Sequence, residues 1–337
     1  MKFTVVRTLN KESWHKFLIE HPNANIFHTP EMFEALNRAH GYQSTLWATV
    51  NDQGTILALF IPVQITLKKG ILSHFTTRSV VYGSVLCSPR DEGERALDYL
   101  LRDYLNQDNH NSLFTELRNL CDLTTVLPVL DKWGFVYEGH LNYLNYLNCP
   151  LDKIMSNLSR STRQKISREL RRDRVSISEI NKRNQLTEWY TLLQKTYAVA
   201  KVSLAGISLF EAAFDILYPR GMIKFLLARV DGIGAACSVE LIYKDAIYGW
   251  YGGMDRNFSY YHPTEMLTWH ILKWGVENGY RVYDFGGAGK PDEEYGVRDF
   301  KAKFGGTLVN YGRNIRIHHP LRLKLSKSGY AVYRRFL

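Results

Sequence analysis

The residues best suited to chemistry gather in one stretch near the C-terminus, YDFGGAGKPDEEYGVRDFKAKFGG, which runs from Tyr283 to Gly306. Asp284 closes an apolar segment and stands beside Gly286 and Gly287. A carboxylate at such a strand end can act as a base, orient an amine or only form a turn. The two glycines would let the strand end open onto a substrate.

Two lysines follow in the same stretch, Lys301 and Lys303, between Phe300 and Phe304. The aromatic flanks indicate that at least one of these lysines lies in a partly desolvated site, where an ammonium can stabilise a developing oxyanion. A surface lysine that keeps its head group in water is the alternative.

The glycine-rich sequence GGAGK is not a phosphate-binding P-loop. That pattern requires a glycine five residues before the Gly-Lys pair and a serine or threonine after it. Asp284 stands five residues before Gly289, and Lys290 is followed by Pro291, so the match fails at both ends.

The densest basic stretch lies earlier, from Leu158 to Arg174. Arg160 and Arg163 share one helical face with Arg171, and guanidinium groups bind phosphates in a bidentate manner. A solvated helix face is the alternative. An apolar stripe is expected on the same helix, formed by Leu151, Ile154, Leu158, Ile166 and Leu170.

A duplicated order of elements positions these residues: hairpin, strand, helix, strand. This order is similar to that of acyltransferases of the GNAT type. In the first copy we expect a hairpin over 46–63, a strand over 79–87, a helix over 94–105 and a strand over 112–120. In the second copy we expect a hairpin over 225–241, a strand over 246–254, a helix over 263–279 and a strand over 281–288.

The predicted fold class is α+β, with two tandem GNAT-like domains whose mainly antiparallel sheets are flanked by helices. We expect an N-terminal domain over residues 1–149 and a C-terminal domain over residues 150–337. The first copy has TELR where the second has YDFG, so the chemistry is expected in the second copy.

Composition limits the partners. The 337 residues carry a formal charge of +10, which favours an anionic partner such as nucleic acid, anionic lipid or a phosphorylated substrate. The four cysteines form no CxxC pair, and no metal site is expected. No apolar signal segment begins the sequence, so we expect a cytoplasmic location.

The regions where a GNAT enzyme would hold coenzyme A lack the expected features. The segment 255–265 has no glycine, and Pro263 removes a backbone N–H. The segment 88–95 contains acidic residues that would repel a phosphate. An acyl-CoA-dependent N-acyltransferase acting on a cell-envelope or polysaccharide precursor is therefore the second hypothesis.

The C-terminal half resembles the Fem family of peptidyl transferases, the FemA, FemB and FemX group. The resemblance rests on the aromatic strand that ends in Gly252-Gly253, the helix that opens at Pro263, the YDFGG strand end, and G-V-x-x-F-K-x-x-F-G-G over 296–306. The opening segment 26–36 and the basic helix also look like the family.

The resemblance implies transfer of an amino acid from aminoacyl-tRNA onto an amine of a lipid-linked or UDP-linked peptidoglycan precursor, with tRNA as co-substrate and no other cofactor. The family's Phe-Lys pair falls on Phe300 and Lys301, and an aromatic at Tyr251 would border the same site. The chain lacks a long coiled-coil insertion and is in this respect similar to the compact FemX type.

The sequence thus leads to a hypothesis of direct aminolysis, in which Lys301 stabilises the oxyanion and Asp284 orients or deprotonates the amine. Further substrate contacts are expected from Arg160, Arg163, Arg298, Tyr251, Lys303, Gly286 and Gly287. A third hypothesis is a non-catalytic tRNA- or glycan-binding module. A monomer is expected. The basic and apolar tail over 318–337 would rest on an anionic membrane or pack on its own domain.

Overall fold

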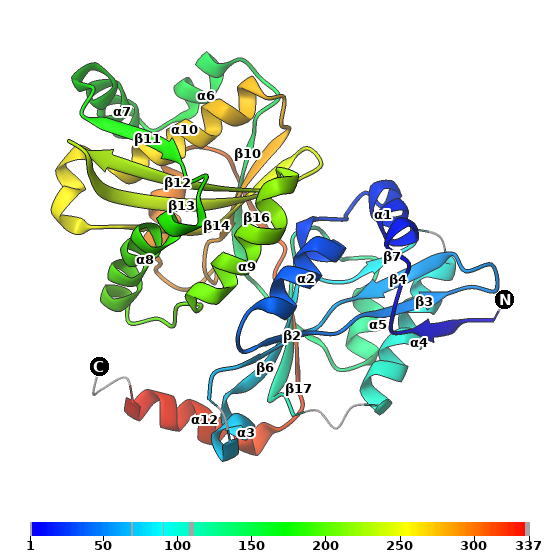
Figure 1. The fold of residues 1–337 in the computed structure, drawn as a ribbon. Helices are drawn as coiled ribbons and strands as arrows, with labels where there is room; N and C mark the ends of the chain where they lie inside the picture. Colours follow the sequence, from blue (N-terminus) through cyan, green and yellow to red (C-terminus); the bar gives the residue numbers. More distant parts are fainter. Residues whose placement is uncertain (1, 69, 90, 108–110, 334–337) are drawn as a thin grey trace. The chain divides into compact units, whose positions relative to one another are not determined.

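The structure is a computed structural model that describes residues 2–68, 70–89, 91–107 and 111–333 (Figure 1). The chain forms two compact units, each with its own sheets and helices. The first unit comprises Met1–Gly139 and Tyr311–Leu337, and the second comprises His140–Asn310. The predicted α+β class is confirmed, because only two strand pairs, β14 with β15 and β6 with β8, are parallel among the described residues.

The division between the units differs from the expected boundary at residues 149 and 150. Strand β10 (Leu141–Tyr146) lies in the sheet of the second unit, between β15 and β16. Strand β17 (Arg313–Ile317) returns to the first unit, where it lies between β8 and β9. A boundary drawn from local sequence missed this return because β17 pairs with a strand about two hundred residues earlier in the chain.

The first unit contains two sheets and the helices around them. The four-stranded sheet has the order β1 (Thr4–Val6), β3 (Trp47–Val50), β4 (Ile56–Phe60), β7 (Leu86–Cys87). The six-stranded sheet has the order β2 (Tyr42–Ser44), β5 (Val63–Thr66), β6 (Thr77–Tyr82), β8 (Phe114–Arg118), β17, β9 (Val136–Glu138). The helices are α1 (Lys11–Glu20), η1 (Ile26–His28), α2 (Pro30–Arg38), η2 (Gly70–Leu72), α3 (Ser73–Thr76), α4 (Asp91–Gln107), α5 (Leu127–Lys132) and α12 (Pro320–Tyr333).

The second unit is a seven-stranded sheet covered on both faces. Its order is β11 (Val175–Glu179), β12 (Ile223–Val230), β13 (Ile233–Tyr243), β14 (Ala246–Met254), β15 (Val282–Gly287), β10, β16 (Thr307–Asn310). One face carries α6 (Leu151–Asn157), α7 (Arg160–Arg172) and α10 (Pro263–Glu277), and the other carries α8 (Leu186–Ala200) and α9 (Ile207–Leu217) (Figure 1). The remaining helices are η3 (Arg183–Gln185), η4 (Tyr218–Arg220), η5 (Arg256–Tyr261) and α11 (Gly296–Ala302).

The predicted repeat of hairpin, strand, helix and strand is present in both units. The second hairpin turns at Asp231 and Gly232, whose φ angles are 50° and 84°. Two consecutive residues with positive φ are the signature of a type I′ turn, which matches the twist of the flanking strands. The strand expected over 79–87 is interrupted in the first unit, because the chain leaves β6 at Gly83, where φ is 75°, before β7 begins.

The apolar stripe expected over 151–170 falls on two helices rather than one. Helix α6 ends at Asn157, and Ser159 caps α7 by accepting a hydrogen bond from the Thr162 N–H at 3.2 Å. A serine hydroxyl at this position satisfies one of the free N–H groups of the new helix. The expected apolar stripe therefore breaks, and Leu170 is 51% exposed. None of the helices in the described ranges is long and apolar enough to cross a membrane.

Helix α10 lies close to the sheet because it carries a glycine at the point of contact. A Cβ atom built on Gly275 would stand 2.6 Å from Leu147 Cδ1 and 3.0 Å from Ile247 Cδ1. Leu147 and Ile247 both belong to the core between α10 and the sheet. A larger residue at position 275 would have to displace these two side chains or the helix itself.

We predict that Gly275→Ala destabilises the protein by about 1–3 kcal/mol, although alanine favours helix more than glycine does. Urea denaturation followed by circular dichroism measures the change. Gly329→Ala in α12 is the matched control, because a Cβ there meets no atom within 4 Å. Equal stability of Gly275→Ala and the native protein would contradict the close packing.

Candidate active site

The site is built where two parallel strands part. Strands β14 and β15 pair in register from Ala246 with Val282 to Tyr248 with Asp284. Beyond this point β14 continues to Met254, while β15 ends at Gly287, and the described residues show no further pair between them. Asp284 is thus the last residue of β15 that pairs with β14.

The Asp284 carboxylate is buried and held from two sides. Its Oδ1 accepts a hydrogen bond from the Gly286 N–H at 2.7 Å and another from Asn142 Nδ2 at 3.3 Å. Burial raises the pKa of Asp284 to about 6, and the hydrogen bond from Gly286, the charge of Lys301 and the bond from Asn142 oppose this rise. A carboxylate with this pKa can both hold and release a proton near neutral pH.

Lys301 places its ammonium against the end of β15. Its Nζ donates to the carbonyl oxygens of Phe285 at 2.6 Å, Gly286 at 3.2 Å and Gly287 at 2.8 Å. Burial lowers the pKa of Lys301 to about 8, and the charge of Asp284 opposes this. Lys301 therefore remains an ammonium at pH 7, and an ammonium has three N–H donors. In this arrangement all three are directed at backbone carbonyls, so none is left for an oxyanion.

The structure distinguishes clearly between the two lysines of the stretch. Lys301 lies on the inner side of α11, whereas Lys303 ends that helix and is exposed. The Lys303 carbonyl accepts the Ser159 N–H at 2.8 Å, which joins the end of α11 to the start of α7. Phe300 packs against the buried Phe304 with ring centroids 5.2 Å apart. Phe300 thus anchors α11 to the core.

Gly286 and Gly287 allow neighbouring groups of the protein to approach the backbone of β15 closely, so they do not open the strand end as expected. Gly286 has φ 70°, and a Cβ there would lie 3.1 Å from the Gly249 carbonyl oxygen and 3.2 Å from Tyr248 Oη. A Cβ on Gly287 would lie 2.9 Å from His140 Nε2. Only glycine fits position 286, because the positive φ angle and the close neighbouring atoms both exclude a side chain.

Arg298 holds the loop that joins β15 to α11. Its guanidinium donates to the carbonyl oxygens of Ala288 at 2.9 Å, Pro291 at 3.3 Å and Glu293 at 2.7 Å, and also to that of Lys290. The predicted phosphate ligand is thus occupied by its own loop, and most of its donors are used there. The loop is held in place by this clamp.

Arg160 and Arg163 are not brought to Asp284. Both lie on α7, which packs against α10 on one face of the sheet. Arg160 is exposed, and Arg163 donates to the Ser156 carbonyl at 3.3 Å. Tyr283 faces the core under α10. Since neighbouring residues of a strand point to opposite faces, Asp284 and its partner Asn142 lie on the other face of the sheet, away from α7 and α10.

Tyr251 reaches the same face as Asp284 through a bulge in β14. The register of β14 with β13 shifts between the pairs Tyr251 with Val239 and Gly249 with Glu240, so Trp250 is the extra residue. As a result Trp250 and Tyr251 both contact Phe210 of α9, with ring centroids 5.8 and 5.0 Å away. Without the bulge, strand alternation would point Tyr251 toward α10.

Aromatic residues from α8 extend this surface. Tyr197 lies 6.1 Å from Tyr251 between ring centroids. Burial, with Tyr295 and Cys237 as further causes, raises the pKa of Tyr197 to about 12. Tyr197 therefore stays a protonated phenol, able to donate a hydrogen bond to a substrate.

Sequence reasoning missed Asn142 and Glu240. Asn142 orients Asp284 from the neighbouring strand β10. The sequence feature that could have pointed to it is an amide at an inward position of the strand LNYLNY. Glu240 lies on the α10 face of β13, is 2% exposed, and accepts a hydrogen bond from Tyr283 Oη at 3.1 Å. Its signal is a single carboxylate in an otherwise apolar strand.

The start of α10 is poorly suited to bind a phosphate. His262 precedes the helix with φ 49°, and Pro263 supplies no N–H. Glu265 stands in the first turn and pairs with Lys165 at 3.1 Å, while Arg168 donates to His262 Nε2 at 2.6 Å. The cations beside this helix end are therefore already bound to groups of the chain itself.

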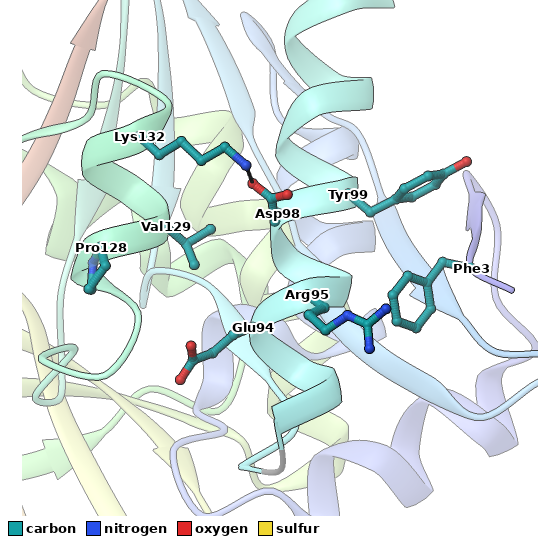
Figure 2. A pocket seen from close by; sticks show the side chains of 8 residues that line it. All are labelled: Phe3, Glu94, Arg95, Asp98, Tyr99, Pro128, Val129 and Lys132. Atoms are coloured by element: carbon teal, nitrogen blue, oxygen red, sulfur yellow. Dashed lines mark hydrogen bonds and ion pairs between the residues drawn. The ribbon is translucent and has the colours of Figure 1, made fainter. Parts of the chain in front are cut away.

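The corresponding helix of the first unit, α4, borders a hollow of about 520 Å³ (Figure 2). Glu94 faces it, Asp98 pairs with Lys132 at 2.6 Å, and the Arg95 guanidinium lies 5.8 Å from the Phe3 ring centroid. The two carboxylates in the lining are thus balanced by two cations, Arg95 and Lys132, so the hollow has no net charge that would favour an anion.

Within the described residues, no three histidine, cysteine, aspartate or glutamate side chains gather in a way that could hold a metal ion.

Comparison with known proteins concerns the fold that carries this site. Residues 156–301 match the family model described as an acetyltransferase (GNAT) domain. The chain is similar to the crystal structure of FemX, with 16% identity, 96% of this chain and 99% of that chain covered, and a TM-score of 0.73. No curated protein sequence matches the chain.

Two further solved structures are similar to the chain in fold. One is the C-terminal domain of a putative lysylphosphatidylglycerol synthetase from Agrobacterium fabrum, with 12% identity, 95% of both chains covered and a TM-score of 0.59. The other is a tandem GNAT protein from the clavulanic acid biosynthesis pathway, with 11% identity, 93% of this chain and 97% of that chain covered, and a TM-score of 0.57. The predicted tandem GNAT-like fold of the Fem type is confirmed, and the matched domain is of the acyltransferase class.

We predict that Glu240→Gln removes part of the pH dependence of stability. Burial raises the pKa of Glu240 from 4.5 to about 7, so the folded protein binds this proton more tightly than the unfolded chain. The resulting stability is present below pH 4.5 and is lost as the pH rises to about 7. The unfolding free energy of Glu240→Gln, relative to that of the native protein, should therefore increase between pH 5 and pH 8 by about 3 kcal/mol.

Urea denaturation at several pH values measures this difference. Glu277→Gln is the control, because Glu277 is exposed and pairs with the exposed Lys273 at 3.5 Å. A difference between Glu240→Gln and the native protein that is independent of pH would contradict the assignment.

We predict that Lys301→Met costs about 3 kcal/mol of stability and loosens the end of β15. The variant leaves three carbonyl groups without their donor, and each unsatisfied buried group is unfavourable. Amide hydrogen exchange of residues 284–288 should accelerate in parallel. Lys303→Met should change the stability by less than about 0.5 kcal/mol, since Lys303 is exposed. Equal effects of the two variants would contradict the role of Lys301.

Proposed function

We propose that the protein transfers an aminoacyl group from aminoacyl-tRNA to an amine of a peptidoglycan precursor, by direct aminolysis in the second unit. The observation that carries the proposal is the buried Asp284, held by Gly286 and Asn142 at the point where β14 and β15 part. It provides one poised carboxylate on a face lined with tyrosines, which suits an amine that must lose a proton as it attacks.

The reaction proceeds in one displacement. The acceptor nitrogen attacks the ester carbonyl carbon, the N–C bond forms, and the bond to the departing ribose oxygen breaks. Asp284 takes the proton from the nitrogen and then gives this proton to the departing ribose oxygen, so the carboxylate is regenerated. Correct positioning of the two substrates on the sheet supplies much of the remaining rate enhancement.

Lys301 acts in this scheme as a positioning residue, which revises the expectation that it contacts the oxyanion. Its ammonium gathers the carbonyl groups of Phe285, Gly286 and Gly287, and its charge keeps the pKa of Asp284 from rising further. We assign the stabilisation of the oxyanion to backbone N–H groups of β14 beyond Tyr248, where the pairing with β15 has ended.

Tyr251, Trp250 and Tyr197 form the surface on which we place the acceptor. The phenol of Tyr197 and the half-buried ring of Tyr251 offer hydrogen-bond donors and apolar contact together. The charge of +10 favours an acceptor or donor that carries phosphates, as both tRNA and a nucleotide- or lipid-linked precursor do. We place the enzyme in the cytoplasm, where these substrates are made.

Coenzyme A is the less favoured donor. Pro263 and Glu265 at the start of α10 offer a pyrophosphate one N–H fewer and a carboxylate nearby. Incubation with charged tRNA, and separately with acyl-CoA, against a panel of muropeptide precursors should yield product with charged tRNA alone, as read by mass spectrometry. Product with acyl-CoA alone would make the enzyme a coenzyme A-dependent N-acyltransferase.

We predict that Asp284→Asn lowers kcat by about 10²–10⁴-fold, because the base is lost while its hydrogen bonds remain. In the native enzyme kcat/KM should rise with pH around an apparent pKa of about 6, the value to which burial raises Asp284. Asp299→Asn, an exposed acid on α11, is the control. Transfer by Asp284→Asn at the native rate would contradict this mechanism.

A further inference from the structure

We propose that the first unit docks on an anionic lipid bilayer through a patch formed by Leu67, Ile71, Leu72, Leu321 and Leu325. The patch joins the η2–α3 segment to the outer side of α12. The proposal concerns a binding surface of the first unit and does not depend on the transfer reaction of the second.

The two parts of the patch are far apart in sequence and adjacent in space. Helix α12 packs against α3, and Ser326 Oγ donates a hydrogen bond to the Phe75 carbonyl at 2.6 Å (Figure 1). This bond fixes which side of α12 faces the protein. Leu321 and Leu325 are four residues apart and therefore share one side of the helix, which is turned to solvent.

The apolar side chains of the patch are unusually exposed. Their exposed fractions are 83% for Ile71, 80% for Leu321, 62% for Leu325, 58% for Leu72 and 53% for Leu67. Leu67 lies in the segment after β5, Ile71 and Leu72 lie on η2, and Leu321 and Leu325 lie on α12. Because η2 and α12 both contact α3, these five exposed aliphatic side chains gather in one region of the first unit, and exposed apolar groups gathered in this way mark an interaction site. Transfer of these groups into the acyl region of a bilayer would be favourable.

Basic residues are neighbours in sequence of the apolar residues of the patch, and the two segments contain no acidic residue. Neither 67–78 nor 311–333 contains aspartate or glutamate. The exposed basic residues beside the apolar side chains are Lys68, His74, Arg322, Lys324 and Lys327. An apolar centre with a basic rim complements anionic headgroups above an acyl layer. A protein partner would have to supply both an apolar surface and a ring of acids, whereas an anionic bilayer presents both everywhere.

The expected tail helix is thus both packed and exposed. Ser326 holds α12 to the segment that contains Phe75, as in a helix that packs on its own domain, and Leu321 and Leu325 lie on another, exposed side of the helix. The last four residues, 334–337, lie outside the described residues.

The test is co-sedimentation of the full chain with vesicles, in the absence of donor and acceptor. One set of vesicles contains phosphatidylcholine alone, and the other contains equal parts of phosphatidylcholine and phosphatidylglycerol. The protein should bind the mixed vesicles, bind the neutral ones far less, and dissociate as salt is raised.

Three variants probe the patch, namely Ile71→Ser with Leu72→Ser, Leu321→Ser with Leu325→Ser, and Lys324→Gln with Lys327→Gln. Each should weaken binding to mixed vesicles by about 10-fold or more. Ile233→Ser is the matched control: Ile233 is 60% exposed but lies in the second unit, and its replacement should leave binding unchanged. All replaced side chains are exposed, so circular dichroism should show native folding.

Three results would overturn the proposal. These are a lack of binding to mixed vesicles, equal binding to neutral vesicles, and patch variants that bind as the native chain does. Sedimentation of the protein without lipid provides a further outcome: a dimer that dissociates in Ile71→Ser with Leu72→Ser would assign the patch to a second copy of the chain. Because no transfer is measured, failure here leaves the reaction proposed for the second unit unaffected.

Discussion

The ammonium of Lys301, bound by three consecutive carbonyl groups, is the interaction on which the candidate site depends. Backbone carbonyls at a strand end normally need partners, and here one side chain supplies donors to Phe285, Gly286 and Gly287 together. At the same strand end Gly286 has φ 70°, and its N–H donates to the Asp284 carboxylate while its carbonyl accepts from Lys301. The same charge limits the rise of the pKa of Asp284. A lysine that organises the backbone thus prepares a neighbouring acid for proton transfer.

The sheet keeps two buried carboxylates apart. Asp284 belongs to the face covered by α8 and α9, whereas Glu240 lies under α10 with the phenol of Tyr283. Burial raises the pKa of both carboxyl groups. The charge of Lys301 opposes this rise at Asp284, whereas at Glu240 the hydroxyl groups of Ser238 and Tyr283 oppose it. The bulge at Trp250 completes the division, because it turns Tyr251 to the face of Asp284. Small backbone irregularities therefore decide which residues share the site.

Sequence reasoning succeeded where local patterns determine the structure. The Asp231-Gly232 turn, the helix opening at Pro263 and the strand ending in YDFGG follow from turn chemistry and periodicity, and the structure has all three. It failed where the outcome depends on how the chain folds back. The return of β17 to the first unit pairs strands about two hundred residues apart. The carbonyl partners of Lys301 and Arg298 lie nearby in sequence, but which groups they meet depends on the path of the loop between β15 and α11.

Nuclear magnetic resonance of the lysine Nζ groups tests the central claim most directly. In protein labelled with ¹⁵N in its lysine side chains, Lys301→Met identifies the resonance of Lys301 by its absence. The account predicts an ammonium resonance at neutral pH whose protons exchange slowly with water, because burial and three carbonyls protect them. It also predicts that this resonance stays in place when donor and acceptor are added. Exchange as fast as that of exposed lysines such as Lys303, or a large shift on addition of substrate, would contradict it.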